Sequence, residues 1–216
     1  MAETNEPKYL KEALFLAESY TKMLEEREWL EKRIAGSWTY TKEMAIAELD
    51  SITVSYENER VQSSNISNPT ERIALKLTDE YMARKQAEMD AERNACSTDL
   101  EYLNWKIGVV ETVWHERAEG IQQSVFQLLY YQHRTFKEAV DILFRRKKTK
   151  VYDCSLVSIK EKLWLLFAKE IEFCFQNRTE QQFVERLTAE ANSAFTASIN
   201  EAEKEGIDEQ TKRKTG

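Results

Sequence analysis

The chain has 216 residues, with 38 acidic and 31 basic side chains and a formal net charge of −7. This balance argues against non-specific polyanion binding by the whole molecule, although a local basic site is still compatible with it. The sequence offers no run approaching the roughly 18 to 20 apolar residues of a membrane span, and its acidic, polar start is unlike a secretory signal. We therefore expect a cytoplasmic protein with no membrane partner.

Composition predicts an all-α fold. The chain holds 5 Gly and 2 Pro, and Ala, Leu, Glu and Lys dominate, which favours helices over strands and turns. Its three cysteines, Cys96, Cys154 and Cys174, lack the short spacing of a metal site or a disulfide framework. They are expected to be reduced core thiols, which again fits the cytoplasm.

In the N-terminal region, residues 1–36 are predicted to form one helix, because apolar side chains recur at helical spacing from about 8 to 35 and Gly36 is a plausible stop. Residues 37–68 are expected to be a polar connection with room for one or two helical turns. Asn68-Pro69-Thr70-Glu71 then has the pattern of a helix start. Residues 69–119 should form a helical hairpin or a long kinked helix, with a new start or a kink near Cys96-Ser97-Thr98-Asp99.

A short coiled-coil-like seam lies within this segment. It consists of Leu100, Leu103, Ile107, Val110 and Trp114, spaced by three and four residues. Because the seam covers only about two heptads, both intramolecular hairpin packing and a dimer zipper remain open. The expected architecture is thus an N-terminal long-helix hairpin or coiled-coil-like region, followed by shorter helices.

The second half predicts two short helices and two longer ones. The short helices cover 121–132 and 135–144, and Thr135 is a good cap for the second. A long helix should begin at Ser155 or Ser158, with its apolar side formed by Leu156, Ile159, Leu163, Phe167, Ile171 and Cys174. A last helix is expected within 177–206, and residues 207–216 are predicted to be a disordered tail.

Motifs for catalysis are missing from the sequence. His115 and His133 are the only histidines, and neither belongs to a metal-binding pattern. Gly108 and Gly120 stand alone, so no glycine-rich phosphate loop is present. The carboxylates are spaced like solvated helix faces. We expect no enzymatic activity, no cofactor and no metal.

One stretch of the chain has a net positive charge, whereas the rest is net negative. Residues 133–150 hold seven basic and two acidic side chains, whereas the segments on either side are both net acidic. Two short helices, a basic turn and a longer helix are the plan of a helix-turn-helix domain, predicted here over 120–176, whose last helix reads the major groove. The predicted DNA contacts, to phosphates and base edges, are Arg134, Lys137, Arg145, Arg146, Lys147, Lys148, Lys150, Ser158, Lys160 and Lys162.

A basic run between helices is also common on ordinary surfaces, so the charge alone leaves a plain solvated loop open. The spacing from Leu143 to Ser155 is moreover longer than the usual three- or four-residue turn.

Three stretches within residues 60–175 are "NISNPTERIALKL", "VFQLLYYQHRTFKEAVDIL" and "LVSIKEKLWLLFAKEI". In these stretches the chain resembles the RinA/ArpU family of phage transcription activators. In that family a helical N-terminal region precedes a helix-turn-helix similar to that of sigma factors. "TFKEAVDIL" takes the place of the threonine-led second helix, and "SLVSIKEKLWLLFAKEI" that of the reading helix. The resemblance implies a regulator in a bacterial host cell that activates late phage genes through double-stranded promoter DNA and host RNA polymerase.

A second class of function fits the same sequence. A helical protein-interaction module, such as a phage-encoded inhibitor of a host protein, would use the acidic N-terminal two-thirds of the chain to pair with a basic partner. Under the DNA-binding interpretation, the N-terminal helices would instead form a homodimer or contact the polymerase.

Overall fold

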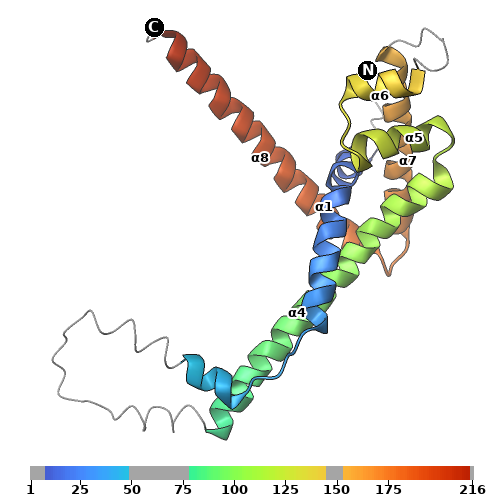
Figure 1. Cartoon of the computed structure of the whole chain (residues 1–216). Coiled ribbons are helices and arrows are strands. Elements are labelled where there is room, and N and C mark those ends of the chain that lie inside the picture. Colours follow the sequence, from blue (N-terminus) through green and yellow to red (C-terminus); the bar gives the residue numbers. More distant parts are fainter. Residues whose placement is uncertain (1–7, 49–77, 145–152, 215–216) are drawn as a thin grey trace. The chain divides into compact units, whose positions relative to one another are not determined.

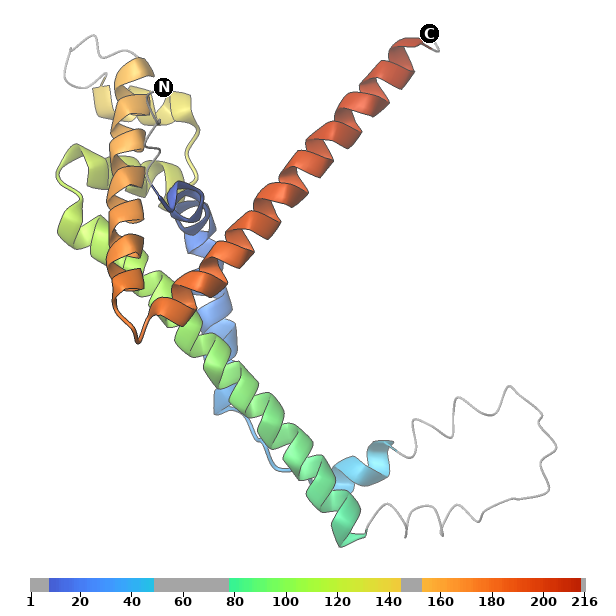
Figure 2. The ribbon, with the colours of Figure 1, turned by 180° about the vertical axis from the view of Figure 1, so that it is seen from behind.

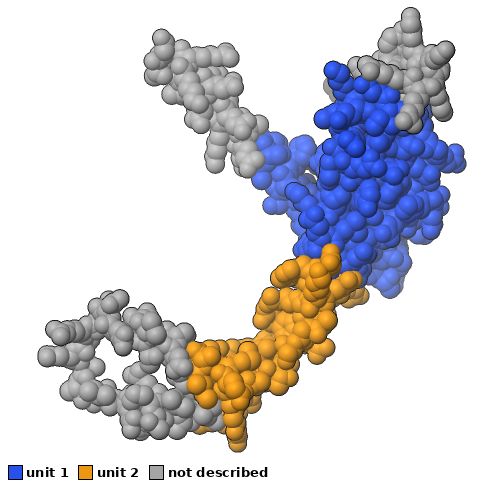
Figure 3. Space-filling view, in the orientation of Figure 1, with its two compact units in different colours: residues 1–27, 102–216 blue, residues 28–101 orange. Residues whose placement is uncertain are grey.

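In the computed structural model, which describes residues 8–48, 78–144 and 153–214, every regular element is a helix (Figure 1). No strand occurs among these residues, which confirms the predicted all-α class. The chain divides into two compact units, one of residues 1–27 with 102–216 and one of residues 28–101 (Figure 3). Helices α1 and α4 each contribute residues to both units.

Helix α1, Leu10–Ala35, agrees with the helix predicted near the N-terminus. Its inward positions Leu16, Tyr20 and Met23 follow the predicted spacing and are buried. Past the last helical residue, the Gly36 N–H donates to the Arg33 carbonyl at 3.1 Å, which closes the final turn.

In the unit of residues 28–101, the segment after α1 is held by one glutamine. The Gln86 side chain donates to the Trp38 carbonyl at 2.8 Å and accepts from the Tyr40 N–H at 2.8 Å. Residues 42–48 are helical, within the predicted polar connection. Residues 49–68 of that connection and the start proposed at Asn68-Pro69-Thr70-Glu71 lie outside the described residues.

Helix α4, Asp79–Thr112, corrects the expectation of a new start or kink near Cys96-Ser97-Thr98-Asp99. The helix runs through this stretch without interruption. The Ser97 hydroxyl donates to the Arg93 carbonyl at 3.0 Å, and the Thr98 hydroxyl donates to the Asn94 carbonyl at 3.1 Å. Hydroxyls that bond back to their own helix leave the backbone pattern intact and do not act as caps.

The middle of the apolar seam lies in α4 and is buried within the unit of residues 1–27 and 102–216, while Leu100 and Trp114 at its ends are half-buried. Leu103, Ile107 and Val110 are each at most 2% exposed. Tyr102 on the same helix lies near Phe183 of α8, with ring centroids 5.8 Å apart. The seam therefore packs intramolecularly, as one of the two alternatives predicts, while a dimer zipper stays a prediction.

Five shorter elements follow α4 in the same unit. They are the π-helical segment η1 (Val113–Arg117), α5 (Ile121–Phe126), the π-helical segment η2 (Gln127–Tyr131), α6 (Phe136–Phe144) and α7 (Asp153–Gln176). Aromatic side chains of η1, α5 and η2 meet in one cluster, in which Trp114 lies 5.0 Å from Phe126 and 5.7 Å from Tyr131 between ring centroids. Tyr20 of α1 joins this cluster at 5.7 Å from Phe126.

Helix α8, Gln181–Lys214, follows α7 after a short turn (Figure 2). It extends through residues 207–214, which corrects the predicted disordered tail for that stretch. The physical reason is composition, since Glu, Lys, Gln and Arg are good helix formers and the single Gly206 costs about 1 kcal/mol. Val184, Leu187 and Ala191 are buried, whereas residues 192–199 are all exposed.

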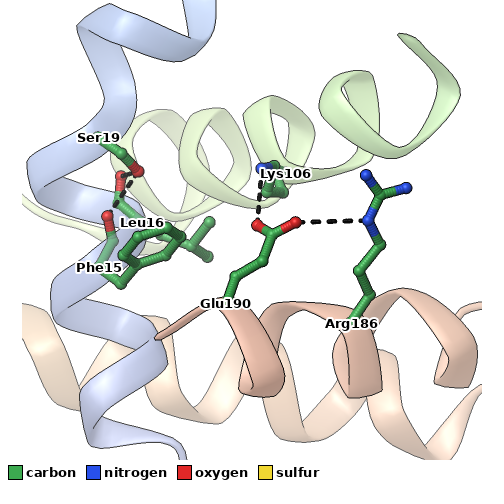
Figure 4. Close-up of polar contacts among 6 residues, drawn as sticks. All are labelled: Phe15, Leu16, Ser19, Lys106, Arg186 and Glu190. Carbon is green, nitrogen blue, oxygen red and sulfur yellow. Dashed lines mark hydrogen bonds and ion pairs between the residues drawn. The ribbon is translucent and has the colours of Figure 1, made fainter. Parts of the chain in front are cut away.

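An ionic cluster fastens α8 to α4 (Figure 4). Glu190 of α8 accepts from Lys106 of α4 at 3.1 Å and from Arg186, one turn earlier in α8, at 3.3 Å. Both cations also lie over the Tyr102 ring, at 4.5 Å and 4.1 Å from its centroid. Lys106 is only 8% exposed, so its charge is compensated by one carboxylate and one aromatic face.

Candidate nucleic-acid interface

Three helical segments share one apolar core in the region predicted as a helix-turn-helix. The buried members Val125, Leu128, Ala139 and Leu156 come from α5 with its continuation η2, from α6 and from α7. The side chains packed around them are Leu129, Phe136, Val140, Leu143 and Ile159. A small core built this way fixes the two short segments against the first turns of α7.

Helix α6 begins with a capping box, in which Thr135 is the cap as predicted from the sequence. The Thr135 N–H donates to Glu138 at 2.9 Å, and the Glu138 N–H donates to the Thr135 hydroxyl at 3.3 Å. The hydrogen bonds that Thr135 donates to the Glu138 carboxylate, the backbone one first, lower the pKa of Glu138 below its ordinary value. The cap fixes where α6 begins and therefore which of its side chains enter the core.

Helix α7 begins at Asp153, two residues before the earlier of the two predicted starts. All six predicted inward positions face the interior: Ile159 is half-buried and Leu156, Leu163, Phe167, Ile171 and Cys174 are buried. The opposite side carries Ser158, Lys162 and Lys169, all exposed. The outer face of α7 is defined by those three residues together with the exposed Val157, Glu161 and Leu165.

Five of the predicted DNA contacts, Arg145, Arg146, Lys147, Lys148 and Lys150, lie outside the described residues.

Of the others, Arg134 and Lys137 are exposed at the start of α6. The Arg134 N–H donates to the Leu128 carbonyl at 2.8 Å, which ties the turn before α6 to η2. Ser158 and Lys162 share the outer face of α7. The structure therefore brings Ser158 and Lys162 together, and leaves Lys137 on the neighbouring helix α6 and Arg134 in the turn before it.

Lys160 is placed apart from Ser158 and Lys162. Two residues along an α-helix correspond to a rotation of about 200°, so a side chain two positions after Ser158 points toward the other side of α7. There the Lys160 ammonium lies 5.0 Å from the centroid of the Trp164 ring. The Trp164 indole N–H in turn donates to the Tyr130 hydroxyl at 2.9 Å.

Apolar side chains on this surface were missed by the sequence reasoning. Val157 and Leu165 on the outer face of α7 are 45% and 37% exposed, and Ile142 of α6 is 44% exposed. The signal was present in the sequence, since each of the three falls off the inward spacing of its helix. The outer face of α7 is consequently mixed, with lysines, one carboxylate and two aliphatic side chains.

Reactive groups near this region are restrained by burial. Desolvation, reinforced by Glu180, raises the pKa of the Cys174 thiol to about 12, so the thiol stays protonated at neutral pH.

Among the described residues no group of three or more His, Cys, Asp or Glu side chains is placed to hold a metal ion. Within the same residues, no helix has the length and apolar character needed to cross a bilayer.

Comparisons of the chain with protein-family models, with curated proteins and with solved structures find no match in any of the three.

Proposed function

We propose that residues 121–176 bind double-stranded DNA and that the protein is a phage-type transcription regulator similar to the RinA/ArpU activators. In this proposal the outer face of α7 enters the major groove, and the basic residues 145–150 contact the flanking phosphates. The N-terminal helices form a homodimer or contact host RNA polymerase, in the cytoplasm of the bacterial host.

One observation supports the proposal above all others. The three segments predicted for a helix-turn-helix pack on one apolar core, and that packing leaves Ser158, Lys162 and Lys169 exposed on the outer face of the third helix. Serine and lysine meet phosphate oxygens and base edges, and two lysines separated by seven residues lie on the same side of a helix.

The test is fluorescence anisotropy of the full chain with a labelled duplex from a late phage promoter, at several salt concentrations. The double variant K162A/K169A should bind more weakly, and the slope of log K against log salt should fall by about two, because each lysine lost from a phosphate releases about one counterion fewer. A matched control is K22A/R178A, which removes two exposed positive charges from outside α7.

The basic window is tested separately by replacing Arg145, Arg146, Lys147 and Lys148 with alanine. This variant should also bind more weakly and show a smaller salt slope. If both variants bind as the parent chain does at every salt concentration, or if the control loses as much affinity as K162A/K169A, the proposed function is wrong.

A second candidate is a protein-interaction module, for example a phage-encoded inhibitor of a host protein. The exposed Val157 and Leu165 favour it, because aliphatic side chains on an outer helix face gain more from a protein groove than from phosphates. A V157S/L165S variant distinguishes the two candidates. Capture of a host protein should be lost under this second interpretation, while the salt slope on DNA stays the same under the first.

A further inference from the structure

A cavity of about 320 Å³ lies on the side of α7 opposite its outer face. Its walls come from four parts of the chain: α1, η2, the turn before α6 with the first residue of α6, and α7. The lining residues are Glu18, Leu129, Tyr130, His133, Phe136 and Lys160. The volume is at the lower end of the range of roughly 300 to 1,000 Å³ for small-molecule sites.

The cavity holds one cation and one anion that do not neutralise each other directly. Neither Lys160 nor Glu18 makes an ion pair with any residue of the described parts of the chain. Lys160 instead contacts the face of Trp164, which leaves the ammonium hydrogens available for an acceptor. Two unpaired charges of opposite sign beside apolar walls suit a ligand that carries both charges.

Tyr130 adds a directed polar group to the same wall. Its hydroxyl oxygen accepts from the Trp164 indole at 2.9 Å, and its own hydrogen meets no acceptor among the described residues. Burial, with a further contribution from the negative charge of Glu18, raises the pKa of Tyr130 to about 12. The hydroxyl therefore stays protonated and can donate a hydrogen bond into the cavity.

The turn that forms one wall of the cavity is held in an uncommon conformation. His133 has a φ of 51°, in the left-handed region, and its imidazole Nε2 lies 2.8 Å from the hydroxyl of Thr21 on α1. Few residues other than glycine adopt this conformation, and histidine is among those that tolerate it. The hydrogen bond joins the turn to α1 and so holds two of the cavity walls together.

We propose that this cavity binds a free α-amino acid with an apolar side chain. The ligand carboxylate accepts from the Lys160 ammonium and the Tyr130 hydroxyl, the ligand ammonium pairs with Glu18, and its side chain packs on Leu129 and Phe136. This site does not rest on DNA binding, because none of its residues belongs to the outer face of α7.

The experiment is isothermal titration calorimetry of the full chain with four probes: L-leucine, L-phenylalanine, N-acetyl-L-leucine and L-leucinamide. At least one of the two amino acids should bind. Each leucine derivative lacks one of the two charges and should bind at least about tenfold more weakly than leucine, because a charge-assisted hydrogen bond contributes about that factor or more.

Two pairs of variants assign the binding to this cavity. K160M and E18Q should each weaken amino-acid binding at least about tenfold, whereas K162M on the outer face of α7 and E25Q on α1 should leave it unchanged. Thermal melting of each variant checks that the fold persists. The proposal is overturned if neither amino acid binds at millimolar concentration, if the derivatives bind as well as leucine, or if K160M and E18Q bind as tightly as their controls.

Discussion

The ionic cluster between α4 and α8 gives a quantitative test of the fold, because one carboxylate serves two cations of different burial. The Lys106 side chain is 10% exposed and its ammonium lies 3.1 Å from Glu190. The Arg186 side chain is 44% exposed and its Nε lies 3.3 Å from the same carboxylate. Distance is therefore nearly constant between the two pairs, and solvent exposure is the quantity that differs.

The expected magnitudes reflect that difference in exposure. A largely buried charge-assisted hydrogen bond contributes about 1.5 to 3 kcal/mol, and the partly exposed Glu190, at 32%, favours the lower end. An exposed pair one turn apart on a helix contributes about 0.3 to 0.5 kcal/mol. We expect a coupling free energy of about 1.5 kcal/mol between Lys106 and Glu190, and roughly a third of that or less between Arg186 and Glu190.

Double-mutant cycles measure both couplings. The variants are K106M, R186M and E190Q with the two doubles that contain E190Q, and the free energy of unfolding is taken from urea denaturation followed by far-UV circular dichroism. Each single change at a cation also removes its contact with the Tyr102 ring, but the cycle cancels that loss. A Lys106 coupling no larger than the Arg186 coupling would refute the reasoning that burial sets the strength of this cluster.

Three further outcomes are expected. Leu156→Ala, which empties part of the core shared by α5, η2, α6 and α7, should lower the free energy of unfolding by about 2 to 5 kcal/mol in urea, whereas Leu165→Ala on the outer face should cost less than about 1 kcal/mol. Because the pKa of Glu138 is lowered in the folded state, its carboxylate adds to the free energy of unfolding above the ordinary carboxyl pKa, and this gain is lost as the pH falls through the folded-state pKa. The E138Q variant should therefore lose less stability on acidification than the parent chain. Urea denaturation at a series of pH values measures this difference. With the other two cysteines replaced by serine, Cys174 of the folded chain should react with a disulfide reagent at pH 8 more slowly than in urea, because burial raises its pKa to about 12 and limits access to the sulfur. A rate equal to that of the unfolded chain would contradict its burial.

Many of the helices could be predicted because apolar residues recur along them at helical spacing. The inward side of α7 and the cap at Thr135 depend on local spacing and local hydrogen bonding, and both are present in the structure. Ser97 and Thr98 misled the prediction, since a hydroxyl suited to capping also bonds back within a continuous helix, and only the tertiary structure decides which occurs.

The candidate site was less predictable than the fold. Because Lys160 is close to Lys162 in sequence, both were predicted to contact DNA. Because of the rotation of the helix, Lys160 instead lies on the opposite side of α7 from Lys162. Its neighbours in space, Glu18 and Tyr130, are far from it along the chain, so the cavity they line leaves no local pattern to read.

The two π-helical segments on either side of α5 determine how the chain tolerates changes in length. Each is closed by a hydrogen bond that spans five residues, from the Ala118 N–H to the Val113 carbonyl at 2.7 Å and from the Gln132 N–H to the Gln127 carbonyl at 2.9 Å. Deleting a single residue inside either π-helical segment would restore ordinary α geometry there, because a π turn holds one residue more than an α turn. Diverged copies of this protein should therefore align with one-residue gaps at these two places.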